Sequence, residues 1–148
     1  MIYESECTKI VLEMKKILYI FSWIILMFPV LSYAQTDKLP EDIVLSFKAG
    51  NAAELAKHFH TNVELIILEE EDVYSRSQAE QIIRKFFSEH KPSAFKVIFG
   101  GGKENSRYAI CSLETSKARY RVYILTKKQD DTPLIHQLRI EEEEGNDQ

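Results

Sequence analysis

The sequence predicts an α+β domain in which helices pack on one face of a curved antiparallel sheet. Up to Pro92, apolar residues recur mainly at helical spacing, whereas after Pro92 they alternate with polar residues as they do in strands. The turn-rich stretches between the strand-like segments are short, which favours antiparallel neighbours over crossover connections. The predicted order of elements is therefore α-α-β-α-β-β-β-β.

Two short helices are expected at the start of the domain. Pro40 and the acidic residues after it suit a first helical turn, and Gly50 suits the residue that ends a helix. A second helix follows at once, because Asn51 is a good N-cap residue and has Glu54 three positions later. Both helices carry apolar residues at helical spacing, which predicts one buried side for each.

A short strand and a longer helix complete the first half. Apolar, β-type residues at 63–68 predict the strand, and the acidic run at 69–72 predicts a loop after it. Ser77 and Glu80 then form the pattern of a capping box at the start of the longer helix. That helix is expected to end before Pro92, since the residue preceding a proline disfavours helical geometry.

Four strand-like segments make up the second half: 95–99, 107–114, 119–126 and 134–141. One face of their sheet is nearly all apolar and is expected to meet the helices: Ala109, Cys111, Leu113, Tyr120, Val122, Ile124, Leu134, His136, Leu138 and Ile140. The opposite face carries Tyr108, Ile110, Arg119, Arg121, Tyr123, Leu125, Gln137 and Arg139. This second face combines large side chains with charges.

Residues 14–34 have the layout of a secretory signal peptide. Two lysines form a short basic stretch, residues 17–31 are almost all apolar, and the triplet 32–34 has small residues at the two positions that a signal peptidase reads. The alternative is a membrane anchor, which needs roughly 20 apolar residues, more than this run offers. We expect cleavage after Ala34, export to the periplasm or the medium, and no stable membrane anchor afterwards.

The residues before Met14 do not suit a signal peptide. They contain three glutamates against Lys9 as their one basic residue, whereas the start of a signal peptide is positively charged. Beginning at Met14 restores that charge. We therefore expect residues 1–13 to be a misassigned upstream start, 14–34 a signal peptide, and 35–148 a single domain.

Charge and cysteine content narrow the class of protein. The formal net charge is −4, and removal of residues 1–34 leaves it unchanged, so the composition excludes a basic nucleic-acid-binding surface. Acidic residues gather at 69–72 and 141–144, and the second run is interpreted as an acidic tail from about residue 141. Cys111 is the one cysteine of residues 35–148, which excludes a disulfide framework and indicates a small buried hydrophobe.

No cofactor or metal motif is predicted. The glycines before Lys103 resemble those of a phosphate loop, but the rest of that motif is missing, and we interpret residues 100–106 as a flexible hairpin connection. His58 and His60 lie close in sequence, but no third metal ligand has suitable spacing. We expect these histidines to face solvent or to cap a helix.

The order of the elements resembles that of a known superfamily. The segments that carry the resemblance read AGNAAELAKHF, VYSRSQAEQIIRKFF and RYRVYILTKK followed by LIHQLRIE. Over residues 38–142 the chain is similar to the nuclear transport factor 2-like, or cystatin-like, α+β cone, and to small secreted bacterial domains of unknown function within it. The resemblance implies the fold. The superfamily includes isomerases, dehydratases, ligand-binding domains and dimerisation modules, so the fold does not choose among these functions.

Three functions stay open for the interior of the cone. We favour a non-catalytic binding or interaction domain, with ligand-pocket candidates His136, Tyr120, Cys111 and Tyr74. The alternatives are a small isomerase- or dehydratase-like enzyme with His136 as base, and a purely structural dimerisation domain. The resemblance implies that such an enzyme uses Asp, His and Tyr, but the meander strands lack an Asp. An open interior would favour the enzyme, whereas an interior filled by Phe86, Phe87 and Leu138 would exclude it.

The outward face of the sheet is the second candidate region. Its interface candidates are Tyr108, Arg119, Arg121, Tyr123 and Arg139, since tyrosine and arginine are enriched where proteins meet. Members of the superfamily often dimerise through this side of the sheet, so the resemblance implies the same use. We therefore predict a homodimer, or a site for another partner, centred on Arg121 and Tyr123. The alternative is that arginine stems merely cover a half-exposed sheet.

Overall fold

The computed structural model describes residues 9–17, 19–20 and 39–143, and the chain divides into two units, Met1–Gln35 and Thr36–Gln148. In the first unit, residues 9–17 and 19–20 are helical. Across the described ranges, no helix is both long enough and apolar enough to span a membrane. Most of the expected signal peptide, with its cleavage position after Ala34, lies outside the described residues.

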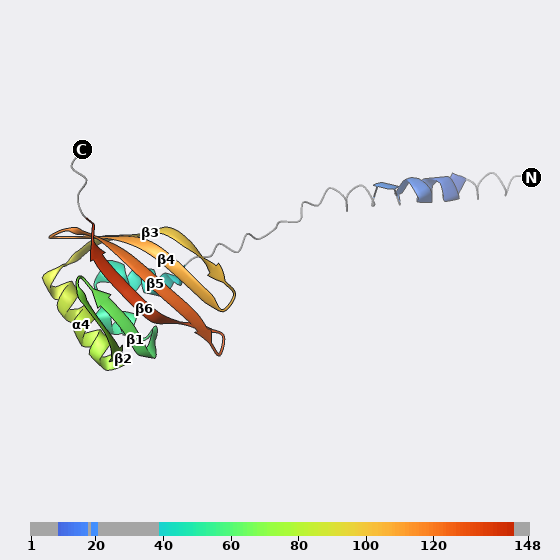
Figure 1. The fold of residues 1–148 in the computed structure, drawn as a ribbon. Coiled ribbons are helices and arrows are strands. Elements are labelled where there is room, and N and C mark those ends of the chain that lie inside the picture. Colours follow the sequence, from blue (N-terminus) through green and yellow to red (C-terminus); the bar gives the residue numbers. More distant parts are fainter. Residues whose placement is uncertain (1–8, 18, 21–38, 144–148) are drawn as a thin grey trace, which may run out of the picture. The chain divides into compact units, whose positions relative to one another are not determined.

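The second unit is an α+β domain, as predicted (Figure 1). Its helices are α2 (Glu41–Ala49), α3 (Ala52–Ala56) and α4 (Arg76–Glu89). Its strands are β1 (Phe59–Ile67), β2 (Glu70–Ser75), β3 (Pro92–Lys103), β4 (Ser106–Thr115), β5 (Arg119–Gln129) and β6 (Thr132–Glu142). They form one curved sheet in the order β2-β1-β6-β5-β4-β3, in which only the β1–β6 pair is parallel.

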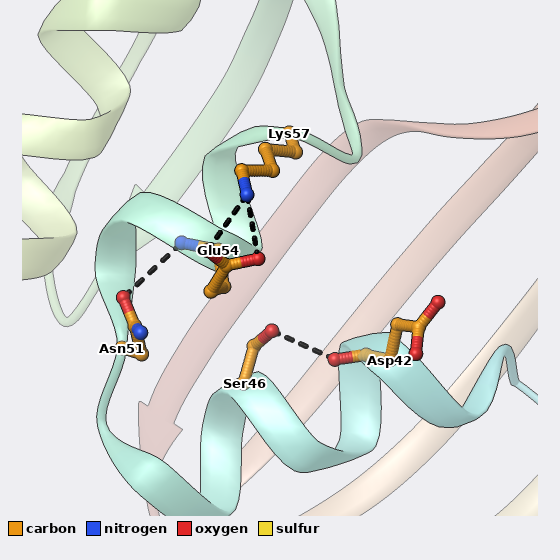
Figure 2. A network of polar contacts seen from close by, with 5 residues as sticks. All are labelled: Asp42, Ser46, Asn51, Glu54 and Lys57. Carbon is orange, nitrogen blue, oxygen red and sulfur yellow. Dashed lines mark hydrogen bonds and ion pairs between the residues drawn. The ribbon is translucent and has the colours of Figure 1, made fainter.

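The corner between α2 and α3 follows the sequence signals closely. Helix α2 ends at Gly50, whose φ of 62° is the left-handed conformation that glycine adopts at little cost. The Asn51 side chain then accepts a hydrogen bond of 3.2 Å from the backbone N–H of Glu54 and caps α3. Figure 2 shows this cap, together with the ion pair of 2.7 Å between Lys57 and Glu54 and the bond of 2.7 Å that Ser46 donates to the Asp42 carbonyl.

Helix α4 begins two residues earlier than the predicted capping box. The backbone N–H of Gln78 donates to the Ser75 hydroxyl at 3.4 Å, and the Gln78 side chain accepts from the Ser75 N–H at 3.1 Å. The box therefore starts at Ser75, and the prediction of Ser77 is wrong. The reason is that β2 ends at Ser75 and α4 begins at the next residue, so Ser75 occupies the N-cap position. The helix ends at Glu89, before Pro92 as predicted.

The acidic run after the first strand is not a loop. Residues Glu70–Ser75 form β2, which pairs antiparallel with β1 and makes the sheet six-stranded. The connection is the tight turn at Leu68 and Glu69. Most of β2 is exposed, so its carboxylates remain in water, and charges of this kind protect an edge strand from pairing with other chains.

The glycine-rich segment is also part of a strand. Strand β3 continues to Lys103, and the hairpin turn shrinks to Glu104 and Asn105. Gly102 has a φ of 130°, and a Cβ atom there would lie 2.4 Å from the carbonyl oxygen of Ser106. A glycine is thus required where β3 and β4 approach each other, and the predicted flexible connection is wrong.

The core lies between the helices and the sheet. Phe47 stacks on Phe95 with ring centroids 4.4 Å apart and meets Phe87 edge-to-face at 5.8 Å. Phe86 meets the ring of Tyr120 at 5.4 Å, and Leu138 is fully buried. Burial of one such side chain stabilises a domain by about 1.5–3 kcal/mol. Phe86, Phe87 and Leu138 are therefore buried in the interior of the cone, which is filled and not open.

The predicted acidic tail from about residue 141 is wrong in its first residues, because β6 extends to Glu142. Glu141 forms an ion pair with Arg139, and Glu143 forms one with Arg121. These carboxylates belong to the sheet, because arginines of β5 and β6 lie beside them. Residues 144–148, the remainder of the predicted tail, lie outside the described residues.

Candidate functional site

The predicted pocket residues Tyr120 and Cys111 are part of the core. Cys111 is fully buried, and burial raises the pKa of its thiol to about 12, so the thiolate is not populated at neutral pH. Tyr120 is 2% exposed and contacts Phe86 and His90 through its ring. Burial and, to a smaller extent, the charge of Glu142 raise the pKa of the Tyr120 hydroxyl. Both side chains pack rather than line an opening.

His136 does not face the helices, so the prediction that placed it on the apolar face is wrong. Leu125 of β5 pairs with Gln137, whereas the next residue, Thr126, pairs with Ile135. His136 is thus one extra residue in β6, a β-bulge that reverses the alternation of side chains. Ile135 takes the buried place instead, and Leu134 and His136 are only partly buried.

The structure separates the four pocket candidates. His136 stacks on His60 of β1, with ring centroids 4.1 Å apart and an angle of 21° between the rings. Burial, followed by the charges of His60 and Lys127, lowers the pKa of His136. Tyr74 lies on the edge strand β2 and packs against the core from its side. These residues do not converge on one cavity with Tyr120 and Cys111.

The interface candidates, in contrast, share one face of the sheet. We call the side of the sheet that carries Tyr123 the outer face. The strand register places one row of residues across it: Ile66, Arg139, Tyr123, Ile110 and Phe99. The neighbouring row holds Glu64, Gln137, Leu125, Tyr108 and Gly101. The register therefore assembles aromatic and aliphatic side chains from several strands into one surface.

The aromatic part of the outer face is open to solvent. Phe99 is 53% exposed and Tyr108 is 45% exposed, and their rings lie 5.9 Å apart. Sequence reasoning missed Phe99, because plain alternation puts it on the same face as Phe95. A register shift between Val97 and Phe99 turns it outward. A single extra residue in β3 thus adds an aromatic ring to the surface.

The polar residues of the outer face carry both signs of charge. Arg139 pairs with Glu141 at 2.8 Å, and Arg121 pairs with Glu143. In these pairs the side chains are between 31% and 41% exposed, so they remain accessible. Gln137 donates a hydrogen bond of 2.8 Å to the carboxylate of Glu64. The predicted arginines are therefore held in place by carboxylates of the same chain.

Arg119, the last interface candidate, lies at the beginning of β5 and pairs with Glu114 at 3.2 Å. Its side chain is 60% exposed, so this pair contributes little to stability. Within the described residues, no group of three or more His, Cys, Asp or Glu side chains is placed to hold a metal ion. Of the two candidate regions, the outer face is the one that the fold assembles.

Comparison with known proteins places the chain in a family. A family model described as a domain of unknown function (DUF4783) matches residues 40–141. The crystal structure of a DUF4783 family protein from Bacteroides uniformis is 32% identical and superposes with a TM-score of 0.70, covering 73% of this chain and 100% of its own. Among curated proteins, no match is found.

More distant solved structures share the fold alone. A domain of unknown function with a cystatin-like fold from Nostoc punctiforme is 13% identical, with a TM-score of 0.59 over 72% of this chain and 74% of its own. A protein of unknown function from Silicibacter pomeroyi that is described as NTF-2-like is 11% identical, with a TM-score of 0.55 over 70% of this chain and 88% of its own. The chain therefore belongs to the DUF4783 family of domains of unknown function, and its fold is the cystatin-like, nuclear transport factor 2-like α+β fold that its sequence resembles.

Proposed function

We propose that this protein is an exported, non-catalytic interaction domain that associates with a second copy of itself through the outer face of its sheet. The observation that carries the proposal is the row of exposed and half-buried large side chains, Phe99, Ile110 and Tyr123, with Tyr108 beside it. A sheet face left to water normally alternates to short polar residues, and this one does not.

The chemistry of this surface resembles that of protein interfaces. Aromatic residues and arginine are enriched in interfaces, because they combine a large contact area with a polar end or charge. Phe99 and Tyr108 are exposed, although each would bury substantial apolar area against a partner. Contiguous apolar surface of this kind, with polar groups around it, marks an interaction site more often than plain surface.

The distribution of charge favours a second copy as the partner. A twofold interface brings the same patch of both subunits together, so the patch must complement itself. The outer face has Arg121 and Arg139 together with Glu141 and Glu143, and the pairs are partly exposed. A twofold-related copy can therefore offer a carboxylate to each arginine. A partner of one charge sign would be repelled by one member of each of these pairs.

The packing of the interior supports a non-catalytic role. Phe86, Phe87 and Leu138 are buried where the alternative function needs a substrate pocket. The proposed base of the enzyme hypothesis, His136, lies on the other side of the sheet against His60, away from Tyr120. General acid–base catalysis needs these groups within hydrogen-bond reach of one substrate, which this arrangement does not supply.

Export rests on the sequence. The signal-like layout at 14–34 precedes the family match, which begins at residue 40. Intact mass of the protein recovered after expression in a bacterial host tests this part of the proposal. A mass that begins at Gln35 supports it, and a mass that retains residues 17–31 contradicts it.

Association is tested by light scattering on the purified protein. We expect a dimer for the wild type and a monomer for Tyr123→Glu, because the substitution replaces a large ring in the centre of the outer face with a carboxylate that must lose its water on association. The matched control is Leu45→Glu, which places the same charge on an exposed leucine of α2 and should leave the dimer intact. A monomeric wild type at high protein concentration would refute self-association.

A further inference from the structure

A groove lies at one end of the domain and shares Glu141 with the outer face. It runs between α4, the turn that connects β1 to β2, and the end of β6, and it has a volume of about 660 Å³. Its apolar lining comes from Ile67, Leu68, Ile82 and Phe86. A space of this size accommodates several side chains of a bound peptide or a ligand of moderate size.

The rim of the groove is strongly acidic. Five glutamates line it: Glu69, Glu70, Glu89, Glu141 and Glu142. One lysine, Lys85, and one histidine, His90, also line the groove. Glu141 is paired with Arg139, whereas the other four carboxylates form no ion pair with any cation of the described ranges. The groove therefore presents unneutralised negative charge around an apolar floor.

Leu68 is held in an unusual backbone conformation at the lip of this groove. Its φ is 58°, in the left-handed region that is unfavourable for a branched side chain and that Gly or Asn occupies more easily. Its N–H donates a bond of 2.8 Å to the Ile140 carbonyl, so the turn is pinned to β6. The side chain is nevertheless 42% exposed. An unfavourable backbone conformation that leaves a leucine side chain partly exposed indicates that this side chain has a functional role.

We propose that this groove binds a basic peptide segment that also carries apolar side chains. The apolar side chains of the peptide would lie on Ile67, Ile82 and Leu68, and its lysines or arginines would pair with Glu69, Glu70, Glu89 and Glu142. The occupant follows from charge complementarity, since an acidic rim repels an acidic or phosphorylated segment and attracts a cationic one. The peptide must also carry apolar side chains, because the apolar floor stays exposed to water unless such a side chain covers it.

Fluorescence anisotropy with synthetic peptides tests the class of ligand. The probe is a labelled peptide of lysines and leucines, and the comparison peptides replace all lysines by glutamate or all leucines by serine. We expect binding of the first peptide, weakened by added salt, and at least about tenfold weaker binding of the other two. Equal binding of the lysine and glutamate peptides, or no binding of the first at millimolar concentration, would overturn the proposal.

Two variants test the groove itself. Leu68→Asn suits the left-handed turn, so the folded domain should be at least as stable as the wild type while peptide affinity falls about tenfold. Glu70→Gln with Glu142→Gln keeps the size of the side chains and should weaken binding about threefold to tenfold. The matched control, Glu104→Gln with Glu114→Gln, removes the same charge elsewhere. Unchanged affinity in both groove variants would refute the site.

The outer-face variant Tyr123→Glu separates this inference from self-association. It should abolish the dimer and bind the lysine–leucine peptide as the wild type does, because Tyr123 does not line the groove. A loss of peptide binding in this variant, with the fold intact, would place the peptide site on the outer face and overturn the assignment to the groove.

Discussion

The imidazole rings of His60 and His136 stack with their centroids 4.1 Å apart and their planes 21° apart. His60 follows the first residue of β1, and His136 is the bulged residue of β6, so the stack joins two strands that run parallel in the sheet. Two protonated rings at this distance repel each other. The stack therefore depends on at least one neutral imidazole.

Acidification should destabilise the domain through this pair. Burial, the charge of His60 and that of Lys127 lower the pKa of His136 below its ordinary value of 6.5. The unfolded chain then binds more protons than the folded one in this range, so the free energy of unfolding falls as the pH drops below about 6.5. Denaturant midpoints at a series of pH values measure the effect.

His136→Gln should remove part of that pH dependence, whereas His58→Gln should not, because His58 forms no ring stack in the described part of the chain. If the wild type and His136→Gln lost the same stability on acidification, another group would be responsible.

Gly102 and Gly101 should respond differently to replacement by alanine. A Cβ at Gly102 meets the Ser106 backbone at 2.4 Å in a left-handed conformation, whereas a Cβ at Gly101 meets the Tyr108 hydroxyl at 3.1 Å. The side chain of Tyr108 can shift, but the backbone cannot. We expect Gly102→Ala to lower the free energy of unfolding by about 1–3 kcal/mol, and Gly101→Ala to cost less. Equal losses in chemical denaturation would contradict this ordering.

The start of α4 separates the observed capping box from the predicted one. Ser75→Ala removes the side-chain acceptor for the Gln78 N–H and should cost about 1 kcal/mol of stability. Ser77→Ala, inside the first turn, should stay within about 0.5 kcal/mol of the wild type. Thermal unfolding of both variants checks the assignment. A larger loss of stability in Ser77→Ala than in Ser75→Ala would mean that Ser77 is the N-cap residue, as the sequence pattern predicts.

Cys111 should be inert in the folded domain. It is fully buried, and the pKa of its thiol is raised to about 12. Thiol reagents attack the thiolate, so labelling should wait for unfolding. In a Cys7→Ser background, a colorimetric thiol reagent should react slowly with the native protein and rapidly in denaturant. Rapid labelling without denaturant would mean that the core opens locally.

Much of the fold was readable from the sequence because its signals are local. Gly50 and Asn51 mark the corner between α2 and α3, since helix ends are decided by residues within one turn. The alternation in β4 and β5 correctly placed Cys111 and Tyr120 on the face that meets the helices, because neither strand is interrupted where these residues lie, but it did not reveal that both are core residues and line no pocket. The same alternation placed Arg121 and Tyr123 together on the outer face.

Tertiary structure alone decided which residues form the two surfaces. One extra residue in β6 moved His136 out of the core, and a register shift in β3 moved Phe99 to the outer face. A bulge is a mismatch in residue count between paired strands, so neither strand reveals it by itself. The groove likewise brings Leu68, Phe86 and Glu142 together from three separate elements, although they are far apart along the chain. Local periodicity thus determined the helices and the central strands, whereas pairing between strands determined the edge strand β2, the length of β3 and which side chains meet.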